Sequence, residues 1–220
     1  MNDFLLIKFL HIVGLAYWLG GDLGVFYSSY FVANDKLSPE VRVAAAKILF
    51  ALDQAPRICM TMMLPLGLHL AWRLGAIPLQ AAGMTMIWLL CFGWLGMVVF
   101  LHFGSGDTAK RAVTKIDYGF RVLAIIALVG TGAAAFVTDM PSIPYWVAAK
   151  LIIFGGLITC GLIVRIKIKD FGPAFANLAK GHPSERDNAA IVRSLGGTRP
   201  FVVTIWIGLL ASAALGLHLI

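Results

Sequence analysis

Long apolar stretches, separated by short polar segments, dominate the pattern along this chain. A helix that spans a bilayer needs about 20 consecutive and mainly apolar residues. A sliding window of about 19 residues finds six such stretches, over residues 4–32, 57–76, 80–103, 118–139, 144–168 and 199–219. The pattern predicts an all-α integral membrane protein with one transmembrane domain over residues 1–220, a bundle of about six helices in a lipid bilayer.

Two segments between these stretches have a different character. Ser38 and Pro39 open a run with apolar residues at helical spacing, a pattern typical of a capped helix start. We expect an amphipathic interfacial helix there, after the first span. Residues 169–198 are charged and contain several Gly and Pro, which predicts one sizeable cytoplasmic loop.

The composition agrees with a membrane protein and excludes a soluble one. Hydrophobic residues make up 60% of the chain and charged residues 13%, whereas charged residues are about 25% of a typical soluble domain. No length remains for a soluble catalytic domain. Cys59, Cys91 and Cys160 lie in apolar stretches without CxxC spacing, so we expect packed core residues rather than disulfides or a zinc site.

The distribution of positive charge predicts the orientation. Lys and Arg number 18 against 11 Asp and Glu, and only Lys8, Arg73 and Lys150 fall on one side of the predicted bundle. This asymmetry explains the net charge without a nucleic-acid partner and, by the positive-inside rule, places both termini outside. The other fifteen cations fall on the predicted cytoplasmic side: Lys36, Arg42, Lys47, Arg57, Lys110, Arg111, Lys115, Arg121, Arg165, Lys167, Lys169, Lys180, Arg186, Arg193 and Arg199.

Ionisable residues inside the predicted spans are the candidates for function, because burying them in lipid costs free energy. Asp22 follows His11 by eleven residues, a rotation of about 1100°, so both lie on nearly the same helix face. We expect Asp22 to relay protons or to pair with a buried cation such as Arg57. The full set is His11, Asp22, Arg57, His69, His102, Lys150 and His218.

His11 and His69 lie at similar predicted depths on neighbouring antiparallel helices. Two such imidazoles can hold the iron of haem b from both axial positions inside a helical bundle. Lys8 and Arg73 lie about one turn further outward, where haem propionates would be. The alternatives are ordinary interhelical hydrogen bonds for the histidines and snorkelling to lipid headgroups for the two cations.

Two other features leave the choice of ligand open. Glycines at positions 14, 20, 21 and 24 of the first span allow close approach of either a macrocycle or a partner helix. Methionines are frequent in the second and third spans, and thioether sulfur binds Cu(I). A complete copper site is not evident, and methionine is a common filler of helical cores.

The first span contains a recognisable series of residues, namely Lys8, His11, Ile12, Gly14, Trp18 and Gly21. In this series the span resembles the opening helix of the copper-resistance D superfamily, which includes HemJ-type protoporphyrinogen oxidases. Trp146, Lys150 and Leu151 are similar to a later HemJ helix, and Arg199-Pro200 is similar to the start of its last helix.

The resemblance implies haem b bound by His11, with Lys150 assisting on a later helix. Together with the predicted depth of these residues in the membrane, the resemblance assigns His11 and His69 as metal ligands and Asp22 and Lys150 as catalytic residues. Lys8, Trp18, Arg73 and Lys150 are the expected cofactor-binding residues.

We therefore expect a membrane-bound haem protein of the bacterial inner (plasma) membrane, with periplasmic termini. It would transfer electrons or oxidise a substrate such as a porphyrinogen, with a quinone or a redox protein as partner and homo-oligomers as one assembly. Two alternatives stay open: a copper permease, and a membrane anchor that holds a redox enzyme through loop 169–198.

Overall fold

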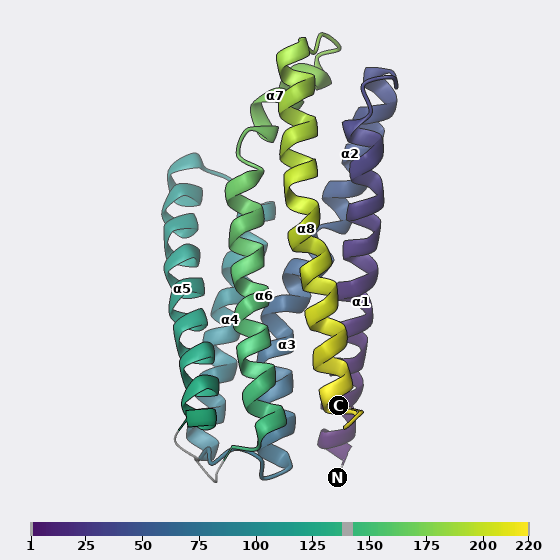
Figure 1. Cartoon of the computed structure of the whole chain (residues 1–220). Helices are drawn as coiled ribbons and strands as arrows, with labels where there is room; N and C mark the ends of the chain where they lie inside the picture. The colour runs from purple at the N-terminus through teal and green to yellow at the C-terminus, as the bar shows by residue number, and fades with distance from the viewer. Residues whose placement is uncertain (1, 138–142, 220) are drawn as a thin grey trace.

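The computed structural model describes residues 2–137 and 143–219, and this part of the chain is helical with short connections. The long helices run roughly along one axis, and α1 begins at the same end of the bundle where α8 finishes (Figure 1). The helices are α1 (Asn2–Ala33), α2 (Pro39–Leu52), α3 (Gln54–Arg73), α4 (Ala81–Phe103), α5 (Asp107–Val137), α6 (Tyr145–Lys167), α7 (Phe171–Ala179) and α8 (Glu185–Gly216).

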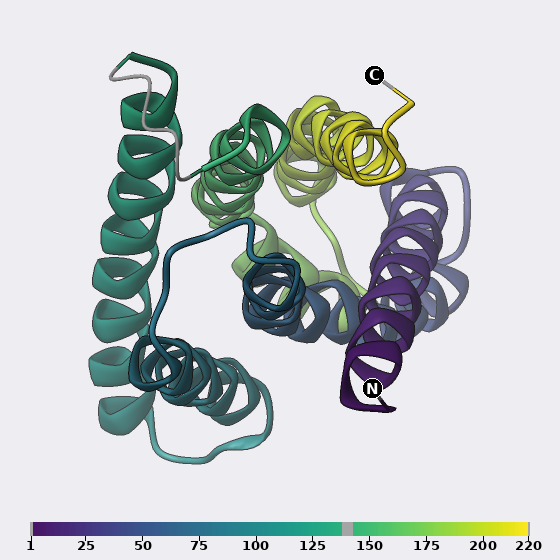
Figure 2. The same cartoon turned by 90° about the horizontal axis from the view of Figure 1, so that it is seen from below.

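Neighbouring long helices form a closed circuit. Helix α1 packs on α3, α3 on α4, α4 on α5, α5 on α6, α6 on α8, and α8 returns to α1. Figure 2 shows this circuit seen from below. Side chains from different ends of the sequence therefore meet in the interior.

The helical membrane bundle predicted from the sequence is supported in its coarse form. Within the described residues, α1, α4, α5, α6 and α8 are long and apolar enough to cross a membrane. Helix α3, which corresponds to the predicted span 57–76, is not among these five candidates. Its 20 residues include Gln54, Arg57, His69 and Arg73, which lower its hydropathy, and it packs between α1 and α4.

The predicted helix limits agree with the structure for the helices whose apolar stretch is bounded by polar residues, Gly or Pro at both ends. The stretch 80–103 corresponds to α4, and 144–168 corresponds to α6. Helix α5 begins at Asp107, well before the predicted start at residue 118. Residues 138 and 139 of that predicted span lie outside the described residues.

The segment 169–198, which the sequence predicts to be the one sizeable loop outside the membrane, has helical structure of its own. This segment contains α7 and the first turns of α8. The start of α8 is a capping box, in which the Ser184 hydroxyl accepts from the Asp187 N–H at 3.2 Å and the Asp187 carboxylate accepts from the Ser184 N–H at 3.0 Å. Such reciprocal bonds satisfy N–H groups that the helix itself leaves free, so a charged, Gly/Pro-rich segment is helical here.

The expected interfacial helix is packed against protein along one side. Helix α2 contacts α1 and α7, and its Ala46 and Leu49 belong to a second core with residues of α1, α7 and α8. Arg42 closes this core, because its Nε donates to the Val32 carbonyl at 2.9 Å and its Nη1 donates to Asn188 Oδ1 at 2.7 Å. The sequence analysis expected the apolar face of α2 to lie on the bilayer surface. Part of this face is instead buried against α1, α7 and α8 at one end of the bundle.

Three of the four glycines in the first span serve helix packing, whereas Gly20 has open space at its Cβ position. A Cβ placed on Gly14 would lie 2.8 Å from the Met63 sulfur, and one on Gly21 would lie 2.8 Å from Pro56. A Cβ on Gly24 would collide with Leu52. Of the two explanations for these glycines, the structure favours close approach of α2 and α3 to α1.

Candidate functional site

A cavity of about 500 Å³ lies inside the helix circuit. Its walls come from α1, α3, α6 and α8, with contributions from the neighbouring helices. Apolar side chains form much of the wall, and they include Trp18, Phe26, Met60, Leu157 and Ile205. A volume of this size falls in the range of about 300–1,000 Å³ that is usual for small-molecule sites.

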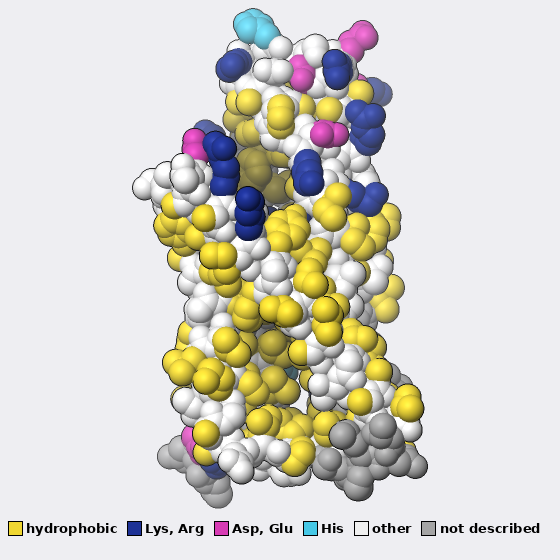
Figure 3. All heavy atoms as spheres, turned by 90° about the vertical axis from the view of Figure 1, so that its left-hand side faces the viewer, with side chains coloured by type: hydrophobic (Ala, Val, Ile, Leu, Met, Phe, Trp, Pro, Cys, Tyr) yellow, Lys and Arg dark blue, Asp and Glu magenta, His cyan; other side chains and the backbone are white. Residues whose placement is uncertain are grey.

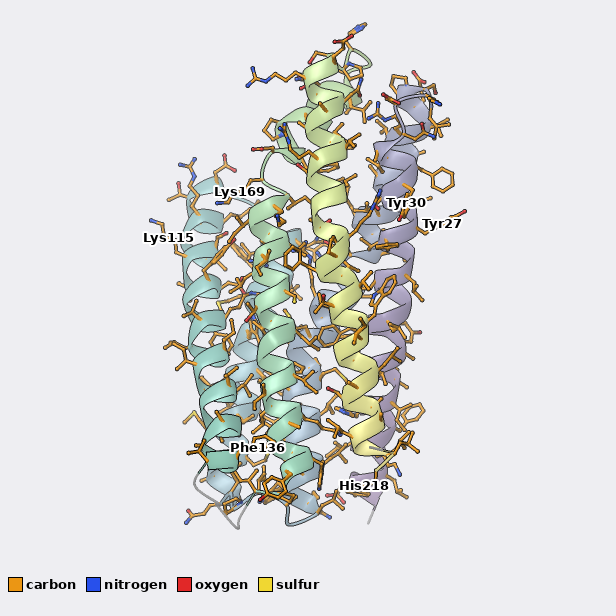
Figure 4. All side chains as sticks on the ribbon, in the orientation of Figure 1. Tyr27, Tyr30, Lys115, Phe136, Lys169 and His218 are labelled. Atoms are coloured by element: carbon orange, nitrogen blue, oxygen red, sulfur yellow. The ribbon has the colours of Figure 1, made fainter. Side chains whose placement is uncertain are left out.

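The cavity lies toward the cation-rich end of the bundle. Figure 3 shows Lys and Arg side chains gathered around a hollow near that end. Figure 4 places Lys169, which lines the cavity, in the same half as Tyr30 and far from His218. The charged residues in the lining are Asp22, Asp53, Arg57, Arg121, Arg165, Lys169 and Arg199.

A buried ion network holds one side of the cavity. Asp117 on α5 is fully buried and accepts hydrogen bonds from Trp94 Nε1 at 3.0 Å and from Arg121 Nε at 3.0 Å. Arg165 on α6 also donates to Asp117. One carboxylate therefore serves two guanidinium groups, and the network ties α4, α5 and α6 together with a net positive charge.

Several buried polar atoms of the lining have no hydrogen-bond partner within the described residues. These are Arg121 Nη2, Arg199 Nε, Asp22 Oδ2 and Gln54 Oε1. Arg121 is only 2% exposed, and its Nη1 donates to the Met60 sulfur at 3.5 Å. Buried polar groups are nearly always paired in folded proteins, so the lining contains two donor groups and two acceptor atoms with unused hydrogen-bonding capacity.

The structure does not bring His11 and His69 together around one cofactor. A Cβ on Gly67 would lie 3.2 Å from His11 Cε1, so this face of α3 meets the imidazole of His11. His69 accepts a hydrogen bond from Trp88 on α4 at 3.1 Å. Positions two residues apart in a helix differ by about 200°, so the two imidazoles lie on different sides of α3. This arrangement does not fit a haem ligated by both.

The cationic residues assigned to the outer end have separate environments. Arg73 forms an ion pair with Asp3 at 2.8 Å, and Lys8 is exposed. The Lys150 ammonium lies 5.2 Å from the centre of the Trp146 ring and interacts electrostatically with His11. His11 and Lys150 are thus brought near one another, while Arg73 is already paired.

Two residues that the sequence assigned to the site line the cavity, namely Trp18 and Asp22. Arg57 and His102, which belong to the wider set of ionisable candidates, line it as well. The other arginines of the cavity were interpreted only as topology signals, because their positions along the chain match the cytoplasmic flanks. Spacing offered one clue for Arg121, which follows Asp117 by four residues and can pair with it along a helix. The ion pair between Asp53 and Arg57 has the same spacing.

No group of three or more His, Cys, Asp or Glu side chains in the described part of the chain is arranged to hold a metal ion. Comparisons with known proteins add no relative, since no family model, no curated protein and no solved structure matches this chain.

Proposed function

We propose that this protein binds a lipophilic organic molecule inside the membrane, in the cavity lined by Trp18, Asp22 and Arg121. The observation that carries the proposal is the combination of cavity volume, apolar walls and a few converging polar groups with unused hydrogen-bonding capacity. Binding sites for small molecules have this composition.

The distribution of cations supports an orientation for this activity. Most of the Lys and Arg lie in α2, in the first halves of α3, α5 and α8 and around the end of α6, which together form one end of the bundle. The cation-rich side of multi-pass proteins faces the cytoplasm. In this orientation the cavity lies in the cytoplasmic half of a bacterial inner membrane and both termini are periplasmic.

The test fills the cavity without disturbing the backbone. Gly161 lines the cavity, and a Cβ at this position would have no atom within 4 Å. We expect Gly161→Phe to occupy the ligand volume and to lower the amount of co-purifying organic molecule about tenfold or more, as measured by solvent extraction and mass spectrometry.

The matched control is Gly156→Phe on the same helix. Gly156 is exposed and also has open space at its Cβ position, so this variant should keep the wild-type ligand content. Equal ligand content in all three proteins would contradict the proposal, as would wild-type protein that carries no organic molecule.

A second candidate is haem-dependent electron transfer with His11 as the residue that would hold the iron. The observation that favours it is the buried Nδ1 of His11, which has no hydrogen-bond partner among the described residues, together with the nearby Lys150. Haem would supply one-electron chemistry when bound, and the Lys150 charge would stabilise an anionic group beside it.

The absorption spectrum tests this candidate. Purified wild-type protein should show a Soret band that shifts on reduction, and His11→Ala should remove at least about nine-tenths of it, because an axial ligand bond is lost. His69→Ala should retain the band, since His69 is engaged with Trp88. A wild-type spectrum without a Soret band, or a His11→Ala protein with full haem content, would contradict this candidate.

A further inference from the structure

The charges around the cavity are unbalanced. Arg57, Arg121, Arg165, Lys169 and Arg199 line it, against Asp22 and Asp53. Asp53 pairs with Arg57, and Asp117 lies behind the wall as the shared acceptor of two arginines. Arg57 is partly exposed and Lys169 is exposed, so the charges further inside are Arg121, Arg165 and Arg199 against Asp22 and Asp117. These still leave cations in excess, and such an excess favours a ligand of negative charge.

Among these cations, Arg121 is the most deeply buried. Its guanidinium is buried, one donor goes to Asp117 and one goes to the neutral sulfur of Met60. Its Nη2 has no partner among the residues that the structure describes. A thioether is a weak acceptor, so two donor positions of a buried cation are poorly satisfied. An oxyanion in the cavity would satisfy them with charge-assisted hydrogen bonds.

Arg199 supplies a second anchor from another helix. Its Cζ lies 3.6 Å from the centre of the Tyr30 ring, and its buried Nε has no partner within the described part of the chain. Stacking on Tyr30 holds the guanidinium in place through a cation–π contact. Arg121 on α5 and Arg199 on α8 thus both line the same cavity, and each has a buried nitrogen with unused hydrogen-bonding capacity.

The rest of the wall suits a hydrocarbon body. Trp18, Phe26 and Leu157 line the cavity, and they offer apolar contact area rather than further donors. Asp22 contributes a carboxyl group to the same cavity, which disfavours a ligand with several negative charges.

We infer that the ligand of the proposed binding function is an amphipathic oxyanion drawn from the bilayer, with one carboxylate or phosphate head bound by Arg121 and Arg199 and a hydrocarbon body against Trp18. This inference rests on the proposed function and adds to it the charge and the chemical class of the ligand.

The experiment compares three probes on the full chain in a neutral detergent. Radiolabelled oleate has both the charge and the hydrocarbon body, methyl oleate has the body alone, and inorganic phosphate has the charge alone. We expect oleate to bind to the wild-type protein at least about 30-fold more tightly than methyl oleate, because a buried charge pair contributes that much or more. Phosphate should not displace oleate.

Variants at Arg199 test the anchor with little risk to folding, since Arg121 is part of the network around Asp117. Arg199→Gln should weaken oleate binding about 30-fold or more and leave methyl oleate binding unchanged. Arg199→Lys should retain most of the affinity for oleate. The control is Arg193→Gln, which removes an exposed charge from the same helix and should have no effect.

The outcomes separate this inference from the function on which it rests. Equal binding of oleate and methyl oleate, or no effect of Arg199→Gln, would overturn the anionic ligand while leaving the cavity site intact. Displacement of oleate by phosphate would overturn the claim that the ligand needs a hydrocarbon body as well as a charged head. Failure of both oleate probes to bind, with ligand content that Gly161→Phe does not change, would overturn the binding function itself.

Discussion

At the scale of single residues, the carboxylate of Asp117 compensates the charges of two arginines, Arg121 and Arg165. It is fully buried and accepts hydrogen bonds from Trp94, Arg121 and Arg165. Buried charges are tolerated when they are paired and hydrogen-bonded. Without Asp117, two guanidinium groups would repel one another inside the bundle.

We expect Asp117→Ala to lower the free energy of unfolding by about 3–5 kcal/mol, because it leaves buried charge without compensation. Denaturant titration in detergent micelles, followed by tryptophan fluorescence, measures this change.

The control is Asp53→Ala, whose partner Arg57 has a side chain 38% exposed. A solvated pair of this kind contributes less than about 1 kcal/mol. Similar losses in the two variants would show that the buried network has no special role in stability.

At the scale of helices, glycines decide how closely α5 and α6 approach. A Cβ on Gly132 would lie 2.7 Å from the Ala148 carbonyl oxygen and 2.7 Å from Ile152 Cγ1. On the facing helix, a Cβ on Gly155 would lie 2.6 Å from Val129 Cγ2. Small residues permit this close packing of membrane helices, which positions Arg121 and Arg165 beside Asp117.

Gly132→Val should therefore destabilise the protein by about 1–3 kcal/mol through overpacking against α6. The apparent melting temperature in detergent reports the change, together with intrinsic fluorescence from Trp94 and its neighbours.

Gly130→Val is the matched control, because Gly130 is exposed and has open space at its Cβ position. Its effect should stay within about 0.5 kcal/mol. An unchanged melting temperature for Gly132→Val would contradict the close approach of α5 and α6.

At the scale of the whole molecule, the apolar pattern predicted the helical bundle and several helix limits to within a residue or two. It did not indicate that much of the polar segment 169–198 is helical, as in α7 and the start of α8. The capping residues Ser184 and Asp187 were a readable signal there. For the site, Trp18 and Asp22 were identified, but the pairing of His11 with His69 was not reproduced.

The sequence by itself determined that this protein is suited to a lipid environment, where its long helices lie, and that its cations are unevenly distributed. It could do so because length and hydropathy are properties of each segment alone. Only the tertiary structure decided which cations face inward. A helix can turn any of its faces to its neighbours, and the face of α5 that carries Arg121 depends on how Gly132 packs against α6. Arg121 and Arg199 are far apart in the chain, and only the closed circuit of helices brings both to one cavity.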